Sequence, residues 1–197
     1  MYYWRHLSET ARKTILDHRQ NQHLPWHSPP HYSNNRTRYM ITAACYDHAH
    51  IIGYSLSRMK NFEMKLLKTI HANSNNIYAW ILLPNHYHVL IDTTAILSVL
   101  SNLGQLHGST AYQWNGQETK RGRQVWHNSA EKVMKSDRHF FATMNYIHNN
   151  PVVKQWQDWP FSSVHKYLKS VGHEKAQEIW ENYPVLQYGD DWDPADL

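Results

Sequence analysis

Two histidines separated by one residue are the first residues whose types and spacing could do chemistry. His86 and His88 begin an apolar run that follows a Pro-Asn turn and ends at Asp92. The run has a period of two, which predicts a β-strand with His86, His88 and Leu90 on one face. The two Cα atoms would lie roughly 6.5–7 Å apart, so both imidazoles could reach one divalent cation about 2.1 Å away. The pair is a candidate metal site, although 16 histidines in 197 residues can also produce this spacing by chance.

The composition is that of one domain with extensions at its ends. A net charge of +4 and a pI of about 9.1 predict weak attraction to polyanions. The single cysteine, Cys45, excludes an intramolecular disulfide and a Cys-based zinc cluster, and it fits a reducing cytoplasm. No apolar run reaches the roughly 18–20 residues of a membrane span, and the first residues lack the apolar core of a signal peptide. We therefore expect a cytoplasmic protein without a membrane partner.

The elements that must position the histidines follow a recognisable order. Hydrophobic spacing predicts strand 39–46, helix 57–72, strands 77–83 and 86–92, helix 95–114, strand 124–127 in a small hairpin with 131–135, and helix 137–150 capped by Asp137. This is the ferredoxin-like split βαβ order of an α+β fold, an antiparallel sheet with two helices on one face. Strands 39–46 and 86–92 would be central. Tyr87 and Val89 would then face the helices, which leaves His86 and His88 on the uncovered face.

Three parts of the chain are expected. Residues 1–37 hold a helix capped by Ser8 that runs to about residue 22, and a Pro-rich connector. Residues 38–152 form the central domain. Residues 153–197 form a tail, which ends in a further helix and an acidic run that suits a cover over the domain rather than a grip on DNA. The aromatic residues expected to pin this tail to the sheet are Trp156, Trp159 and Phe161, and the helix carries Glu178, Trp180 and Tyr183.

Helix 137–150 carries two further candidates, Tyr146 and Asn150. At 100° per residue they lie about 40° apart and about 100° from the apolar stripe, whereas His148 lies about 160° from Tyr146 and is disfavoured as a ligand. An amide oxygen such as that of Asn150 is a ligand for Mg²⁺ or Mn²⁺. From the residues alone, a packing tyrosine and a polar residue before a proline remain the favoured interpretation. The stripe consists of Phe140, Met144 and Ile147.

Three stretches resemble the HUH single-tyrosine transposases. LPNHYHVLI (83–91) is similar to the His-hydrophobe-His motif of this family, and YIHNNPV (146–152) is similar to its nucleophile helix. WPFSS (159–163) resembles the tail of the REP-associated tyrosine transposase (RAYT) branch. The resemblance covers about residues 38–168, and PWHSPP (25–30) resembles an amino-terminal extension of one RAYT sub-branch.

The resemblance implies a ferredoxin-like fold with the nucleophile helix near the open face of the sheet, and this fold agrees with the order of elements above. It also implies a metal-dependent enzyme with Tyr146 as nucleophile, His86 and His88 as ligands of Mg²⁺ or Mn²⁺, and Asn150 as a third polar ligand where other members carry glutamine. Such an enzyme attacks single-stranded DNA at hairpins or REP-like palindromes. It forms a 5′-phosphotyrosine link and a free 3′-hydroxyl, and rejoins strands without ATP. The chain has no GxxxxGK[ST] loop for binding nucleotide phosphates, which agrees with a reaction that does not use ATP.

DNA contact is expected from the basic loop that follows helix 95–114 and from two tryptophans. Lys120, Arg121 and Arg123 could bind phosphates, and Trp114 and Trp126 could stack on bases. A solvated basic loop and two core tryptophans are the ordinary alternatives.

Rival functions remain open on the sequence. They are a relaxase or replication-initiator nuclease, a mobile insertion-sequence transposase, and a non-catalytic binder of hairpin DNA. A structural zinc site of His86, His88 and His127 is disfavoured because such sites usually have four good ligands. The short link from His127 to Asp137 favours Tyr146 acting within its own chain and a monomer, with a dimer also open. A nucleoid-associated location would follow from action on DNA.

Overall fold

The structure, a computed structural model, describes residues 8–11, 13–14, 17, 37–150 and 159–185. The chain divides into two units, residues 1–35 with 189–197 and residues 36–188. In the first unit the described residues from 9 to 17 are helical, and the Ser8 hydroxyl accepts a hydrogen bond from Ala11 N (3.2 Å), as an N-cap does. The Pro-rich connector, Trp156 and the acidic run 190–193 lie outside the described residues.

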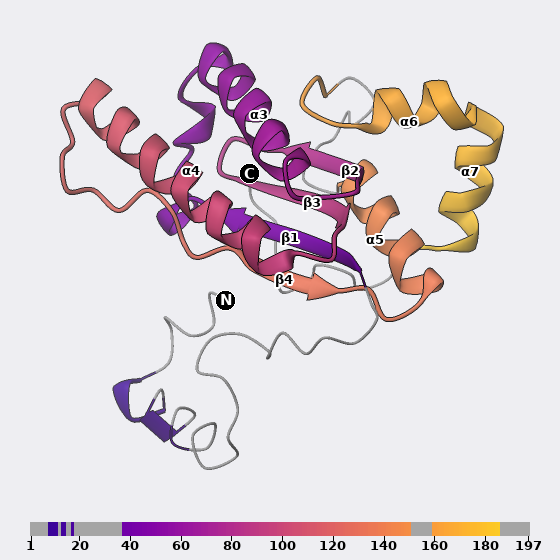
Figure 1. Cartoon of the computed structure of the whole chain (residues 1–197), viewed down its shortest axis with the longest axis horizontal. Coiled ribbons are helices and arrows are strands. Elements are labelled where there is room, and N and C mark those ends of the chain that lie inside the picture. The colour runs from indigo at the N-terminus through magenta and orange to yellow at the C-terminus, as the bar shows by residue number, and fades with distance from the viewer. Residues whose placement is uncertain (1–7, 12, 15–16, 18–36, 151–158, 186–197) are drawn as a thin grey trace. The chain divides into compact units, whose positions relative to one another are not determined.

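The second unit is built on a four-stranded antiparallel sheet (Figure 1). The strands are β1 (Arg38–Ala44), β2 (Asn76–Leu82), β3 (His86–Asp92) and β4 (Ala130–Val133), in the spatial order β2-β3-β1-β4. The two central strands are therefore β1 and β3, as predicted, and the topology is the expected split βαβ arrangement. The bounds of β3 are the predicted ones.

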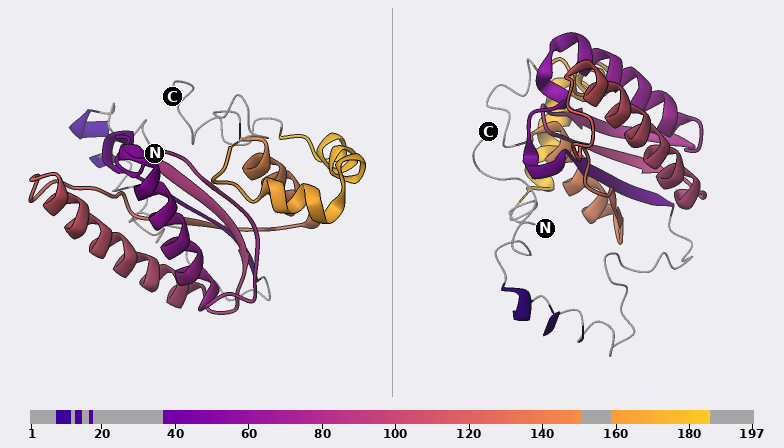
Figure 2. Two further views of the ribbon diagram at one scale, coloured as in Figure 1. Left: turned by 90° about the horizontal axis from the view of Figure 1, so that it is seen from above. Right: turned by 90° about the vertical axis from the view of Figure 1, so that its left-hand side faces the viewer.

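One face of the sheet packs against α3 (Leu56–His71) and α4 (Ile96–Gln117), which lie side by side on it (Figure 2). The Ser55 hydroxyl caps α3 by accepting a hydrogen bond from Arg58 N (3.1 Å). Tyr87 and Val89 point into the core on this side, as the period of two requires. Two 3₁₀ turns, η1 (Tyr46–His48) and η2 (Ile52–Tyr54), connect β1 to α3.

The opposite face carries the helix of Tyr146, as expected, but this face is buried rather than open. Helix α5 (Asp137–His148) lies against β2 and β3, α7 (His173–Asn182) packs on α5, and α6 (Val164–Val171) packs on α7 (Figure 2). His86 and His88 are consequently 1% and 0% exposed. The cap of α5 is Ser136, whose hydroxyl accepts from His139 N (3.1 Å), rather than the predicted Asp137.

The edge beside β1 differs from the prediction. Residues 124–127 and 131–135 do not form a hairpin but lie one after the other along β1. Trp126 forms an isolated bridge with Cys45, and β4 then pairs with residues 39–42. The fourth strand predicted at 124–127 is therefore reduced to a bridge at Trp126, and β4 corresponds to the predicted segment 131–135.

The described residues 159–163 of the tail close the other edge of the sheet. Trp159 Nε1 donates to the carbonyl of Leu82 (2.9 Å), and Leu82 N donates to the carbonyl of Phe161 (2.9 Å). Ser163 N donates to the carbonyl of Trp80 (2.9 Å), so this short segment satisfies the edge of β2. None of the described helices combines the length and the hydropathy needed to cross a membrane.

Candidate active site

His86 and His88 lie next to one another on the face of β3 that α5 covers. Their ring centroids are 5.0 Å apart and the rings are nearly perpendicular. The period of two places both side chains on this face, and α5 packs against β3 there, where both are buried. Two neighbouring buried imidazoles on a rigid strand form a preorganised pair of nitrogen donors.

The protonation of His86 follows from its partner Asn85. The Asn85 amide nitrogen donates to the carbonyl of His48 (3.3 Å), which turns the amide oxygen toward His86 Nδ1 at 2.7 Å. An amide oxygen only accepts, so Nδ1 carries the proton and Nε2 carries the lone pair. This is the tautomer in which an imidazole binds a metal through Nε2.

His88 has a corresponding partner on the neighbouring strand. Thr42 lies directly opposite His88 in the β1–β3 register, and its hydroxyl is 2.8 Å from His88 Nδ1. A threonine hydroxyl can either donate or accept; in the tautomer in which it accepts from Nδ1–H, Nε2 is left as the ligating nitrogen. Metal-binding histidines usually have their second ring nitrogen held in this way. The residues present therefore fit a divalent cation.

Tyr146 approaches this pair from α5. Its hydroxyl is 3.5 Å from His88 Nε2, its ring centroid is 5.3 Å from that of His88, and the side chain is fully buried. The structure thus brings together the tyrosine and both histidines of one chain.

Asn150 does not occupy the helical position that the sequence predicted. Helix α5 ends at His148, and Asn149 has φ −105° and ψ 33°. The following Pro151 disfavours helical geometry at the residue before it, so the i, i+4 argument for Tyr146 and Asn150 no longer applies. Asn150 is buried. His148 points toward α6, where its Nε2 is 3.0 Å from Ser163 Oγ, in keeping with its exclusion as a ligand.

Sequence reasoning did not identify three residues around the pair, Asn85, Thr42 and His48. The ring centroid of His48 is 6.0 Å from that of His86, and both Asp47 and His48 have positive φ (54° and 50°). Such backbone costs roughly 1–2 kcal/mol per residue, and strained residues cluster at functional sites. Asn85 could have been suspected from its position beside His86, but Thr42 requires the strand register.

The donor set of the site is small. Within the described ranges, no group of three or more His, Cys, Asp or Glu side chains could hold a metal ion. His127 packs against Tyr46 with ring centroids 5.0 Å apart, so the zinc site with His127 has no support. Two imidazoles suit a cation that takes its other ligands from water, an amide or phosphate oxygens, as Mg²⁺ does.

The basic loop after α4 is organised by Glu118. This carboxylate accepts hydrogen bonds from Arg123 (2.9 and 3.2 Å) and from Arg58 (2.7 Å), and Lys120 Nζ is 3.8 Å away. Burial alone would raise the pKa of Glu118, but the hydrogen bonds and charges of the two arginines outweigh it and hold the pKa below its ordinary value. Lys120 and Arg121 are exposed, whereas Arg123 is partly committed to this ion pair.

Trp114 and Trp126 belong to the core. They are 4% and 8% exposed and both contact Phe62, with centroid distances of 5.6 and 5.2 Å. Trp126 also stacks on His107 at 4.3 Å and donates from Nε1 to Thr110 Oγ1 (3.1 Å). The core alternative therefore describes both tryptophans, and neither presents an open ring for stacking on a base.

Comparison with known proteins shows a similarity in fold. No family model matches the sequence, and no curated protein matches it. Among solved structures, a REP-associated tyrosine transposase bound to a REP hairpin is 19% identical, with a TM-score of 0.51, over 84% of this chain and 95% of that chain. This chain has the fold of that transposase.

At 19% identity, the likeness to the REP-associated transposase shows the fold alone. A bacterial tRNA(His) guanylyltransferase-like protein in complex with ATP is 11% identical over 85% of this chain and 78% of that chain. Its TM-score of 0.35 is too low to support an argument.

Proposed function

We propose that this protein is a metal-dependent single-stranded DNA transesterase of the HUH single-tyrosine kind, which cleaves and rejoins DNA at hairpin or REP-type sites. The observation that carries the proposal is the position of the Tyr146 hydroxyl, 3.5 Å from Nε2 of His88 and beside the second histidine of the same strand. The fold shared with a transposase that binds a REP hairpin supports the choice of substrate.

In the proposed reaction, Tyr146 Oη attacks a DNA phosphorus atom. A bond forms between Oη and phosphorus while the bond from phosphorus to the 3′-oxygen breaks, and the phenol proton ends on the released 3′-hydroxyl. The number of phosphoester bonds is unchanged, so the reverse attack by a 3′-hydroxyl rejoins the strand without ATP. A tyrosine with an ordinary pKa near 10 is a weak nucleophile at neutral pH.

A divalent cation, Mg²⁺ or Mn²⁺, would supply Lewis-acid polarisation of the scissile phosphate. His86 and His88 would hold it through Nε2, with Asn150 as a proposed third donor. Asn85 and Thr42 fix the ring orientations through the two Nδ1 atoms. Because Tyr146 meets His88 of its own chain, we propose that one chain completes the site and that a monomer is sufficient.

The experiment uses labelled hairpin DNA with a single-stranded flank, incubated with the full chain and Mg²⁺ or Mn²⁺. We expect a covalent protein–DNA species that survives SDS, and its loss in Tyr146→Phe with DNA affinity retained. Tyr87→Phe is a matched control, because Tyr87 is equally buried but faces α3 and α4, where its hydroxyl pairs with His107 (3.1 Å). Tight hairpin binding without any adduct would identify a non-catalytic binder instead.

A further inference from the structure

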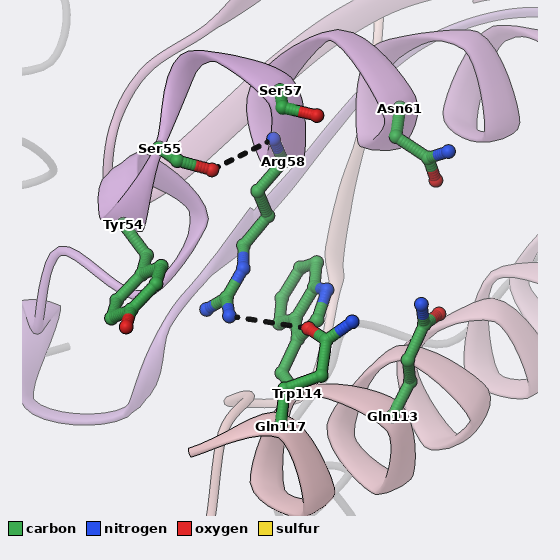
Figure 3. A pocket seen from close by; sticks show the side chains of 8 residues that line it. All are labelled: Tyr54, Ser55, Ser57, Arg58, Asn61, Gln113, Trp114 and Gln117. Carbon is green, nitrogen blue, oxygen red and sulfur yellow. Dashed lines mark hydrogen bonds between the residues drawn. The ribbon is translucent and has the colours of Figure 1, made fainter.

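A polar pocket lies where α3 begins and α4 ends (Figure 3). These two helices pack on the face of the sheet opposite to the one that carries the histidines. The pocket volume of about 280 Å³ is near the lower limit of the roughly 300–1,000 Å³ typical of ligand sites. A pocket of this size suits one small planar group. The larger polar and aromatic side chains that line it include Tyr54, Arg58, Asn61, Gln113 and Gln117.

An aromatic and cationic stack forms one wall of the pocket. The Arg58 guanidinium lies 4.3 Å from the ring centroid of Tyr54 and 5.0 Å from that of Trp114. Arg58 is fixed by Glu118 and by the carbonyl of Ile51 (2.9 Å), yet the Tyr54 ring is 66% exposed. A tyrosine held by a buried arginine and open to solvent on its outer face is a ready platform for stacking on a base.

Carboxamides face the pocket from both helices. Asn61 on α3 and Gln113 on α4 point toward one another across it (Figure 3). Gln113 Oε1 accepts from Lys65 (3.4 Å) and Gln117 Oε1 accepts from Arg58 (3.4 Å), whereas the Asn61 amide has no hydrogen-bond partner among the described residues. Carboxamides offer a donor and an acceptor together, which matches the edge of a nucleobase.

The charge around the pocket favours a polyanion. Arg58, Arg123 and Lys120 surround the single carboxylate of Glu118, so three positive charges and one negative charge leave this cluster at +2. Lys120 is 60% exposed and can meet solvent phosphates. A base in the pocket would therefore have its flanking phosphates beside cations.

The pocket and the candidate active site lie at the same end of the sheet. Gly53, the neighbour of Tyr54, donates from its backbone nitrogen to the carbonyl of Pro84 (2.8 Å), and Pro84 is two residues from His86. A single DNA strand that passes around this end can meet both. We propose that the pocket binds an unpaired nucleobase of the single-stranded DNA whose phosphodiester Tyr146 attacks. The identity of this DNA strand as the ligand rests on the proposed function.

The test measures binding of a fluorescent single-stranded oligonucleotide, and of the hairpin with its single-stranded flank, by anisotropy. Tyr54→Ala and Asn61→Ala change exposed side chains, and each should weaken binding roughly 5- to 150-fold, the range typical of lost base stacking or base-edge contacts. Gln113→Ala should also weaken it. Gln105→Ala, at another exposed position of α4, is the matched control and should leave affinity unchanged. An oligonucleotide with 5-iododeoxyuridine in the unpaired segment should crosslink to Tyr54.

The outcomes separate this inference from the proposed function. If the wild type forms the covalent adduct but the variants at Tyr54, Asn61 and Gln113 bind single-stranded DNA like the control, the pocket is not a base site and the inference is overturned. If these variants lose affinity while the wild type forms no adduct, the pocket binds DNA and the proposed chemistry fails. A crosslink that maps only outside the pocket also overturns the inference.

Discussion

Replacing Thr42 with valine tests whether the neighbours of the histidines set their chemistry. The change keeps a β-branched side chain in β1 but removes the hydroxyl that lies 2.8 Å from His88 Nδ1. His88 is 0% exposed, so its Nδ1 would lose a partner that water cannot readily replace. The expected loss in the free energy of unfolding is about 1–3 kcal/mol. Removing the group that orients a metal-binding imidazole should also lower metal affinity or adduct rate about 10- to 100-fold.

The assay measures the initial rate of adduct formation against Mn²⁺ concentration, beside urea unfolding of the same samples. A rate loss of about 10- to 100-fold corresponds to about 1.4–2.7 kcal/mol of transition-state stabilisation. Thr42→Ser retains the hydroxyl and should restore most of the rate. Thr110→Val removes another buried hydroxyl, the acceptor for Trp126 Nε1, and should lower stability without changing the metal dependence. A Thr42→Val protein with the wild-type rate and metal dependence would refute this role of the hydroxyl.

Two further predictions concern the turn before the histidines and a buried histidine on the other face. In Gly53→Ala the new Cβ would lie 2.5 Å from Pro84 Cβ and 3.0 Å from Pro84 Cα, so the turn that carries Asn85 must shift. We expect a loss of about 1–3 kcal/mol in the free energy of unfolding and a slower adduct. Burial lowers the pKa of His107 from 6.5 to about 4, so folding disfavours its protonation. Stability should be complete above about pH 6.5 and fall by about 3 kcal/mol as the pH drops toward 4, and His107→Gln should remove this part of the decline.

Each of these two predictions has its own check. Gly104→Ala meets no atom within 4 Å of its new Cβ, so it should be neutral or stabilise α4 by up to about 1 kcal/mol. Equal unfolding curves for the variants at Gly53 and Gly104 would contradict the clash with Pro84. Denaturation at about pH 7 and about pH 4.5 measures the second effect, and a wild-type slope retained in His107→Gln would show that His107 is not its source.

The sheet and the histidine pair could be predicted because their signals are local. The alternation of residues 86–92 gives the strand and its two faces directly, and the helical spacing of Met59, Phe62 and Leu66 gives α3. Strand order then follows from short links and the handedness of crossovers. In these strands and in α3, the residues that the periodicity places on the apolar face are the ones that the fold buries.

The surroundings of the site could not be predicted, because they depend on distant contacts. The burial of His86 and His88 reflects the packing of α5 on their face of β3, which leaves no periodic signal in β3 itself. The partnership of Thr42 and His88 depends on the register of β1 against β3. Helix α5 ends at His148, so Asn150 lies beyond the helix and its position cannot be predicted from helical geometry. The interior positions of Trp114 and Trp126 likewise follow from the way α4 and the edge segment meet the sheet.

The most direct test of Tyr146 as the nucleophile is to identify the residue that becomes covalently linked to DNA. The full chain is incubated with a 5′-labelled or 3′-labelled hairpin substrate and Mn²⁺, the covalent species is digested, and the nucleotide-bearing peptide is sequenced by mass spectrometry. We expect a phosphotyrosine at Tyr146 joined to the 5′ end of the cleaved strand, with a 3′-hydroxyl on the released fragment. A DNA adduct on any other residue, or an adduct that persists in Tyr146→Phe, would contradict it.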